Sequence, residues 1–464
     1  MQNRKAFLSI VPLCLCMLLL LSACRKFLDQ PAGTTVINPS TIKDLQEMLN
    51  HDSIALCNFI LADIMSDDMK ISDNALQLDT SSYYARTYLW GKDIWNSGDP
   101  DFIYNSAYRR ILQMNIILNK IDAVEGSAQQ KNIPRAQAQI NRAWYYLQLA
   151  NLYGPHYQST TAAADLSVPL ILQPDAGTLP ARATVQDVYN QILKDLNAAV
   201  SNPDLPDMGA TIVQPGKAAA LALLARTYLY MGNYQQAEEA AHRSLVMRNE
   251  LLDYNVHFIP TTSLLDLSKN PETLMGKLRM DYSGFYSKYT SSFFISKTLG
   301  DLFDTNDNRL IKFFKQDGDV YILNWIDGGQ DLTYMYFNYS IGVPEVLLTE
   351  AECLARRGDT AGALALVNRL RQNRLIQYTP IEGATDVLAT VLQERRRELF
   401  YHGGLRLFDL KRLNRDPRFA QTLQRTADDG STVLAVLEPG APRYLMQFSP
   451  LIIANNPHMI QNPR

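Results

Sequence analysis

The stretch Ala225-Arg-Thr-Tyr-Leu-Tyr-Met-Gly232-Asn-Tyr-Gln-Gln-Ala237 decides the fold, because its pattern of small residues occurs a second time in the chain. The second copy is Ala351-Glu-Cys-Leu-Ala-Arg-Arg-Gly358-Asp-Thr-Ala-Gly-Ala363, with the same spacing from alanine to glycine to alanine. Small residues let two helices cross closely, and glycine readily adopts the left-handed conformation that ends a helix. Each copy therefore predicts two antiparallel helices joined by a tight turn at the glycine.

These copies resemble tetratricopeptide helix pairs, and apolar periodicity predicts more helices in the chain. The predicted helices cover residues 104–121, 133–153, 184–200 and 391–413. Thr184 is expected to cap the third of them, and Gly403-Gly404 to break the fourth. Stacked helix pairs bury a continuous core, so we predict a mostly α fold with repeats over roughly 104–254 and 341–413.

Three segments lose the helical period. Residues 255–340 are rich in Tyr, Phe, Asp, Asn, Ser and Gly, which predicts a long insertion of loops and short strands. Residues 62–101 are expected to form irregular surface, and residues 415–464, with six prolines, a loop-like tail. Long segments without a helical period are usually functional or disordered, and the aromatic content of the insertion argues against disorder.

The first residues predict export and a lipid anchor. Arg4 and Lys5 precede an uncharged apolar run over 6–21, which is short for a membrane span but suits a secretory signal. Leu21-Ser-Ala-Cys24 then resembles the lipobox of bacterial lipoproteins. We expect residues 1–23 to be a signal peptide, Cys24 to carry lipid and residues 24–40 to form a tether. The alternatives are an ordinary secreted protein cut beside a cysteine, or an uncut anchor.

Composition indicates a globular protein with a large core. The chain is 47% hydrophobic and 20% charged, with a net charge of −3, so it carries no basic footprint for nucleic acid. The six histidines lack metal-ligand spacing, and we expect no metal and no cofactor. After the predicted cleavage only Cys57 and Cys353 remain besides Cys24; the sequence does not decide whether they pair, although a buried free thiol is favoured for Cys353.

Several motifs, in order along nearly the whole chain, resemble the SusD/RagB family of outer-membrane nutrient-binding lipoproteins. They are Cys24-Arg-Lys-Phe-Leu-Asp29, Ser72-Asp-Asn74, Arg142-Ala-Trp-Tyr-Tyr146 through Gly154, Leu299-Gly-Asp-Leu-Phe-Asp304 through Leu310, Glu394-Arg-Arg-Arg-Glu-Leu-Phe400 followed by Gly404, Arg406, Phe408-Asp-Leu410 and Arg412, and Asn455-Asn-Pro457 to Pro463. One departure is Phe448-Ser-Pro-Leu451, where the family usually has a Pro-Ile-Pro-like run, so the geometry of that loop is left open.

The resemblance implies a SusD-like domain over 41–464, with four tetratricopeptide-like units behind a loop-rich ligand face. It implies a surface lipoprotein on the outer membrane of a Gram-negative bacterium. Such a protein captures glycan or peptide fragments and passes them, as a hinged lid, to a TonB-dependent SusC-like transporter. Members of the family bind without catalysing, as the resemblance implies.

A glycan site should combine aromatic rings, on which the C–H faces of sugars stack, with polar side chains that bind hydroxyls. Two segments, 73–96 and 282–325, have that composition. The candidate ligand-binding residues are Asp73, Asn74, Arg86, Trp90, Trp95, Asn96, Tyr282, Tyr286 and Trp325. Of these, Trp95, Tyr286 and Trp325 are preferred, whereas Trp144 on a repeat helix is expected in the core. The ordinary alternative is that most of these rings pack under loops.

The charged run from Glu394 to Glu398 is interpreted as structural. The pairs Glu394–Arg397 and Arg395–Glu398 each share a helix face, which predicts ion pairs within the helix. With Arg406, Asp409 and Arg412 nearby, a structural network is favoured over a ligand patch. His402, beside two glycines and without a nucleophile motif, is likewise expected to be structural.

Three functions remain in competition on the sequence alone. The leading hypothesis is a non-catalytic surface protein that binds oligosaccharides, with a peptide-binding member of the same family as its alternative. A lipid-anchored helical glycoside hydrolase needs two carboxylates about 5–10 Å apart, and the candidates are Asp67, Asp68, Asp73, Asp301 and Asp304. A purely structural scaffold would bind no small ligand and leaves the aromatic insertion unexplained.

Overall fold

The computed structural model describes residues 39–175, 177–257, 267–279, 285, 289, 292–317, 320–323, 326–327, 330–331 and 338–464. The predicted signal peptide, the lipidation site Cys24, and the site candidates Tyr282, Tyr286 and Trp325 lie outside these residues. Within them, none of the helices is both long and apolar enough to cross a membrane.

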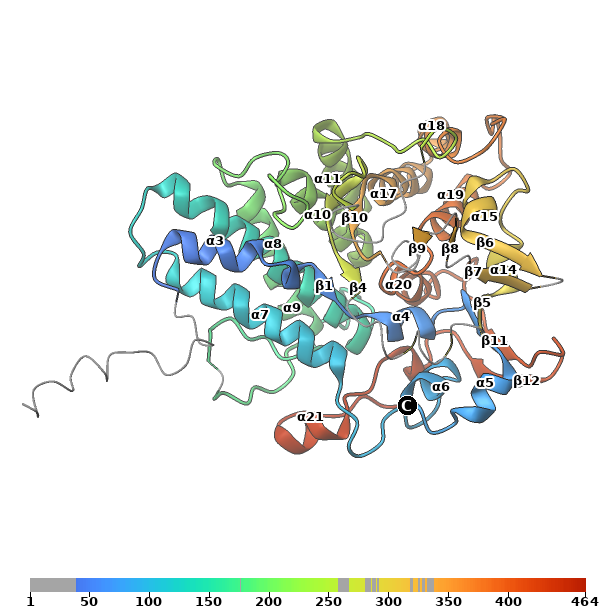
Figure 1. The fold of residues 1–464 in the computed structure, drawn as a ribbon, viewed down its shortest axis with the longest axis horizontal. Coiled ribbons are helices and arrows are strands. Elements are labelled where there is room, and N and C mark those ends of the chain that lie inside the picture. Colours follow the sequence, from blue (N-terminus) through green and yellow to red (C-terminus); the bar gives the residue numbers. More distant parts are fainter. Residues whose placement is uncertain are drawn as a thin grey trace, which may run out of the picture.

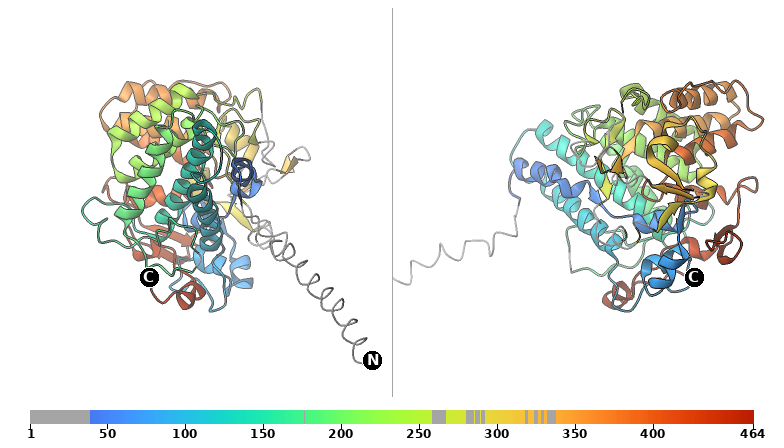
Figure 2. Two further views of the ribbon diagram at one scale, coloured as in Figure 1. Left: turned by 90° about the vertical axis from the view of Figure 1, so that its left-hand side faces the viewer. Right: turned by 45° about the vertical axis from the view of Figure 1, so that its right-hand side comes forward.

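Antiparallel helices packed in sequence order make up most of the fold (Figure 1). From α7 to α19 each packs on its neighbour along the chain, and α11 contacts α17 directly although the insertion separates them in sequence. These helices are α7 (Phe102–Lys120), α8 (Ala128–Tyr153), α9 (Val185–Val200), α10 (Lys217–Met231), α11 (Tyr234–Met247), α17 (Val343–Arg356), α18 (Thr360–Gln372), α19 (Val387–Glu398) and α20 (Leu405–Leu413). Figure 2 shows the same helices stacked side by side in two further views. The mostly α, repeat-like fold is therefore confirmed.

Both copies of the small-residue pattern fold as predicted. Gly232 follows α10 with φ +74°, and Gly358 lies between α17 and α18 with φ +90°. At each turn only glycine adopts this backbone conformation without strain. The alanines of the pattern, Ala225, Ala237, Ala351 and Ala363, are all at most 1% exposed. They are the positions at which α10, α11, α17 and α18 approach one another.

The predicted cap and the predicted break are confirmed, but two helices begin about a turn earlier than predicted. Helix α19 begins at Val387 rather than at 391, because Asp386 caps it. The hydroxyl of Thr184 accepts a hydrogen bond from the backbone N–H of Asp187 at 3.0 Å and caps α9. Gly403 and Gly404, with φ +67° and +86°, separate α19 from α20. The start of α8 was predicted too late, because Ser127 and Gln130 form a capping box that begins the helix at Ala128.

Two of the segments expected to be irregular contain regular elements instead. Residues 62–101 include α5 (Asp73–Leu78), α6 (Tyr83–Tyr88), β2 (Met69–Ile71) and most of α4 (Ile60–Met65), and many of their side chains are buried. The tail contains the hairpin of β11 (Leu423–Thr426) and β12 (Val433–Leu437), η2 (Pro442–Tyr444) and α21 (Pro450–Asn455). Helices of six residues are too short to show a period in the sequence.

The described parts of the insertion form short strands, as expected, together with short helices that the sequence analysis did not predict. Strand β5 (Phe293–Ile295) joins β2 to β7 (Val320–Leu323) and β6 (Phe314–Asp317) in one antiparallel sheet. Further pairs are β1 (Leu56–Cys57) with β4 (Leu278–Arg279), β3 (Thr273–Met275) with β10 (Ile341–Gly342), and β8 (Ile326–Asp327) with β9 (Gln330–Asp331). Helices α14 (Lys297–Gly300) and α15 (Asn308–Phe313) flank this region, while α3 (Ile42–Asn50) packs on α8 and is followed by η1 (Asp52–Ile54). The sheet thus ties the N-terminal segment to the insertion.

Cys57 and Cys353 are both buried free thiols. Burial raises the pKa of each thiol to about 12, so neither is present as a thiolate at neutral pH. Cys353 packs among Leu229 and Ala237 where α10, α11 and α17 meet. It therefore serves as a core side chain.

Candidate functional site

The structure brings together the two aromatic segments that the sequence singled out. Tyr84 of α6 packs against Phe285 and Tyr289 of the insertion, with ring centroids 5.5 Å and 6.2 Å away. On its other side Tyr84 contacts Tyr83 at 4.3 Å, and the ring of Tyr83 lies 5.3 Å from that of Trp95. A continuous aromatic cluster therefore links residues from both segments although about 200 positions separate them.

The cluster is anchored at the insertion end by a partly buried hydrogen bond. Tyr289 is 1% exposed, and its hydroxyl donates to Oδ2 of Asp79 at 2.6 Å. Burial and the neighbouring carboxylate of Asp79 raise the pKa of Tyr289, so its hydroxyl remains a donor at neutral pH. This contact fixes the insertion against the loop that precedes α6.

The C-terminal tail positions Trp95. The indole Nε1 of Trp95 donates to the carbonyl oxygen of Gln447 at 2.8 Å. The side chain of Gln447 accepts from the N–H of Ile94 at 3.0 Å and donates to the carbonyl of Lys92 at 3.0 Å. Trp95 is 7% exposed, so it presents only an edge to solvent, and Tyr83 beside it is half-buried. Gln447 is a positioning residue that sequence reasoning missed, because nothing in the sequence places the tail beside residue 95.

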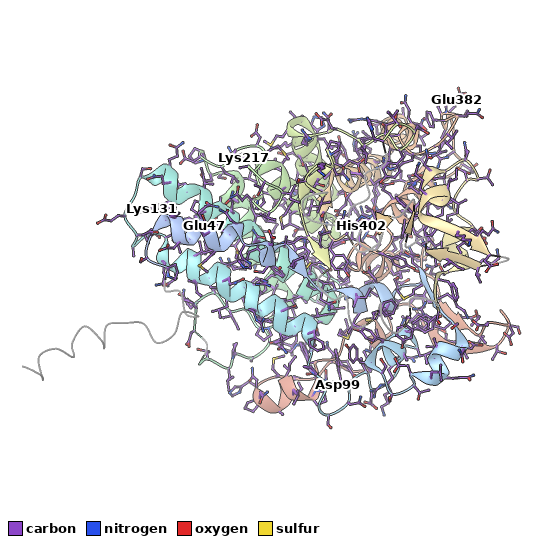
Figure 3. The ribbon with its side chains drawn as sticks, viewed as in Figure 1. Glu47, Asp99, Lys131, Lys217, Glu382 and His402 are labelled. Atoms are coloured by element: carbon purple, nitrogen blue, oxygen red, sulfur yellow. The ribbon has the colours of Figure 1, made fainter. Side chains whose placement is uncertain are left out.

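Polar side chains lie near Trp95, with Arg86 on α6 and Asn96 on the loop after it. The guanidinium of Arg86 donates to the carbonyl of Ser81 at 2.5 Å and lies 4.0 Å from the carboxylate of Asp99. Asn96 is exposed, and its backbone N–H donates to Asp99 at 2.7 Å. Figure 3 shows Asp99 at the lower edge of the molecule, in that view well below His402. Arg86 and Asn96 thus form a polar rim next to the aromatic cluster.

The remaining described candidates differ in what they present to solvent. Asn74 is exposed on α5, whereas Asp73 is tied to Asp428 through two reciprocal bonds from backbone N–H to carboxylate of 2.8 Å and 2.9 Å. Trp90 is 0% exposed, donates to the carbonyl of Met65 at 2.9 Å and carries the guanidinium of Arg425 over its ring. Its inclusion among ligand contacts needs correction, because a completely buried ring has no face for a ligand.

The charged run on α19 forms a buried network, though one of its predicted pairs is wrong. Glu394 is 0% exposed and pairs with Arg397 at 2.8 Å, as predicted, and also with Arg309 at 2.8 Å. Arg395 instead pairs with Asp409 at 2.8 Å, and Glu398 with Arg374 and Arg309 at 2.7 Å each. Partners from other elements outcompete the neighbour within the helix, so the network joins α19 to the insertion, α18 and α20.

The same network extends to the N-terminal segment and α17. Asp67 lies between Arg396 and Arg406, at 3.1 Å and 2.7 Å, and Arg412 joins Asp409 to Glu352. Burial by itself would raise the pKa of Asp409, but the guanidinium groups of Arg395 and Arg412 outweigh it and lower that pKa to about 2. These side chains therefore form ion pairs that stabilise the contacts between separate elements of the fold.

The ring of His402 has a structural contact. Its Nδ1 lies 2.8 Å from the carbonyl oxygen of Phe400, in the turn between α19 and α20. Around it, a cavity of about 80 Å³ is lined by Tyr254, Glu345 and other side chains. Among the described residues no group of three or more His, Cys, Asp and Glu side chains is placed to hold a metal ion.

Two family models match the chain. One, described as "Starch-binding associating with outer membrane", matches residues 26–229, and the other, the SusD family, matches residues 316–464. A SusD-like protein P2 from Formosa agariphila is 30% identical over 155 residues, which is 33% of this chain and 28% of that protein. The match thus spans less than a third of that relative.

Solved structures share the fold over nearly the whole chain. A putative sugar binding protein from Bacteroides vulgatus has a TM-score of 0.74 and 22% identity, covering 92% of this chain and 99% of that one. A SusD superfamily protein from Bacteroides thetaiotaomicron has a TM-score of 0.73 and 21% identity, covering 91% and 100%. Surface glycan-binding protein A from Bacteroides fluxus has a TM-score of 0.68 and 16% identity, covering 92% and 100%. With both family models matched in order along this fold, the chain belongs to the SusD/RagB family.

Proposed function

We propose that this protein captures oligosaccharides at the surface of the outer membrane and delivers them to a TonB-dependent SusC-like transporter. The observation that carries the proposal is the aromatic cluster with its polar rim: Tyr83 and Trp95 beside Arg86 and Asn96. The half-buried ring of Tyr83 offers apolar surface to the C–H face of a sugar, with the exposed part of Trp95 beside it, while guanidinium and amide groups bind the hydroxyls. Family membership agrees with a carbohydrate-binding role in nutrient uptake.

The proposal includes a lipid anchor at Cys24 and a lid-like mode of delivery. The lipobox-like Leu21-Ser-Ala-Cys24 supports the anchor, and the description of the first family model refers to the outer membrane. Diacylation would anchor the chain stably, since each buried CH₂ contributes about 0.8 kcal/mol. Tyr282, Tyr286 and Trp325 remain proposed ligand contacts from the insertion, and closure of the protein over the transporter would carry the ligand inward.

The carboxylates proposed for a glycosidase are engaged elsewhere, which favours binding over hydrolysis. Asp67 and Asp68 pair with Arg396 at 3.1 Å and 2.7 Å. Asp304 pairs with Arg371 at 2.7 Å, and Asp301 with Lys297 at 2.7 Å. A general acid needs a proton to donate at working pH, whereas the arginines overcome burial and hold the pKa of Asp67 well below its usual range. Burial raises the pKa of Asp68, but that side chain is 0% exposed and offers no access to a substrate. We therefore propose a non-catalytic protein.

Titration calorimetry of the full-length protein tests this function. The panel would contain maltoheptaose, cellohexaose, xylohexaose and mannohexaose, with neutral and acidic peptides as the competing ligand class. We expect saccharide binding that weakens in Asn96→Ala and Trp325→Ala but persists in Asn202→Ala, a control far along the chain in the loop after α9. A peptide ligand would move the protein to the peptide-binding branch, and released saccharide products would support the hydrolase instead.

A further inference from the structure

A second groove lies between α7, the loop over 169–180 and α21. Its volume is about 340 Å³, and its lining includes Tyr104, Tyr108 and Ser449. Figure 1 shows α21 below the N-terminal end of α7. The aromatic cluster described above does not include this groove.

Two tyrosine rings form one wall of the groove. Tyr104 and Tyr108, one helical turn apart on α7, have ring centroids 4.4 Å apart with planes inclined at 41°. Phe448 meets the ring of Tyr104 edge-on at 5.8 Å, and the hydroxyl of Tyr108 donates to the carbonyl of Pro169 at 2.6 Å. Both tyrosines are half-buried. The rings are therefore held in place before a ligand arrives, which lowers the entropy cost of binding.

An unsatisfied hydroxyl lies at the base of this groove. Ser449 is 0% exposed, and its Oγ has no hydrogen-bond partner among the described residues. Although Ser449 occupies the N-cap position of α21, its side chain makes no capping bond. A buried hydroxyl without a partner costs free energy, and a bound hydroxyl group would remove that cost. Asn105 and Asn455 at the rim are exposed and add amide groups.

The chemistry of the lining identifies the class of ligand. Every described residue that lines the groove is uncharged, so a charged ligand would lose its hydration without gaining an ion pair from them. Fixed tyrosine rings with hydroxyl and amide groups suit a neutral sugar ring. We propose that this groove is a second saccharide site that binds a neutral hexose or pentose unit. The inference rests on the proposed function, because it assumes that the protein meets oligosaccharides.

The two sites are connected through the tail. Gln447 holds Trp95 in the first site, and Ser449, two residues later, lines the second. Residues 447–449 therefore contribute to both sites. Ser449 and Leu451, which line the groove, belong to Phe448-Ser-Pro-Leu451, the stretch in which this chain departs from the usual family sequence.

A blocking substitution tests the groove directly. Leu451 is 39% exposed and lines the groove, so Leu451→Trp fills the groove without disturbing the core. Ala454→Trp is the control, because it places the same ring on an exposed part of α21 outside the lining. In calorimetry with the four saccharides named above, we expect Leu451→Trp to weaken binding about tenfold, or to abolish one of two binding events. Ser449→Ala should weaken binding in the same direction, and Ala454→Trp should bind like the wild type.

The outcomes separate this inference from the proposed function. Unchanged saccharide binding in Leu451→Trp and Ser449→Ala, together with weakened binding in Asn96→Ala, would overturn the second site and leave the first intact. Binding of decaproline that is lost in Leu451→Trp would overturn the saccharide assignment of the groove. A wild-type protein that binds none of the saccharides would contradict the proposed function, and the second site with it.

Discussion

Replacing Glu394 by glutamine removes the central negative charge of the buried network. In the wild type, its carboxylate lies within 3.0 Å of the guanidinium groups of Arg309, Arg371 and Arg397. Burial alone would raise the pKa of Glu394, but these three cations hold it well below its ordinary value of 4.5. The carboxylate is therefore ionised throughout the physiological range, and the substitution removes a full charge.

The size of the effect follows from what each arginine retains. Arg309 keeps Asp307 and Glu398, each at 2.7 Å, and remains compensated. Arg397, only 7% exposed, keeps the carbonyl of Leu302 at 2.8 Å and the neutral amide oxygen of the new side chain as acceptors, but it keeps no carboxylate partner among the described residues. Breaking a buried ion pair by removing one partner costs about 3–5 kcal/mol, so we expect the free energy of unfolding to fall by about that amount.

The assay is denaturant unfolding of Glu394→Gln and wild type across a range of pH, with Asp416→Asn in an exposed ion pair as the matched control. A carboxylate whose pKa is lowered in the folded state contributes stability above its unfolded value, and that stability is lost as the pH falls. The difference between wild type and variant should therefore shrink below about pH 4.5. Equal stability of the two proteins at neutral pH would refute the structural role. A variant that folds normally but no longer binds saccharide would assign the network to the ligand.

Two further predictions concern the turn between α19 and α20. In Gly404→Ala, the new Cβ would lie 2.4 Å from Cβ of Ala62, at a backbone φ of +86°. Gly430→Ala is the control, because φ is +71° there but no atom lies within 4 Å of the new Cβ. Thermal unfolding should therefore show a much larger loss of stability in Gly404→Ala than in Gly430→Ala. Burial, opposed by the hydrogen bond from the N–H of Gly404, raises the pKa of Asp63 to about 8. Wild-type stability should therefore fall as the pH rises from 3.8 toward 8, by at most about 1.4 kcal/mol per pH unit, because the unfolded chain ionises first. Asp63→Asn should lack that part of the slope in denaturant titrations, and a slope equal to that of the wild type would contradict the assignment.

The helix pairs could be predicted from sequence because their signals are local. Gly232 and Gly358 mark turns through backbone freedom, and the buried alanines mark close helix contacts. The hairpin of β11 and β12 was missed although Asp429-Gly430 is a turn signal, and Gly430 indeed has φ +71°. In that case the sequence contains the turn signal of a hairpin, but the prolines of the tail favoured the prediction of a loop.

The site was less predictable because it depends on contacts between distant segments. Composition made both Trp90 and Trp95 candidates, with Trp95 preferred, and the structure shows that Trp90 is completely buried whereas Trp95 is 7% exposed. The difference arises from Arg425 and Gln447, which pack on them from the tail. In the same way, Arg395 forms its ion pair with Asp409 on α20, at 2.8 Å, rather than with Glu398 on its own helix. Spacing along a helix predicts which pairs can form, whereas tertiary packing decides which pairs do form.

The most direct test of the account is saccharide binding by the aromatic cluster. Calorimetry of full-length wild type, Trp95→Ala and Trp95→Phe would be carried out on the four saccharides, with circular dichroism confirming that each variant is folded. The account predicts binding by wild type, weaker binding in Trp95→Phe, which loses the bond to Gln447, and still weaker binding in Trp95→Ala. Folded Trp95→Ala that binds saccharides as tightly as the wild type would contradict it.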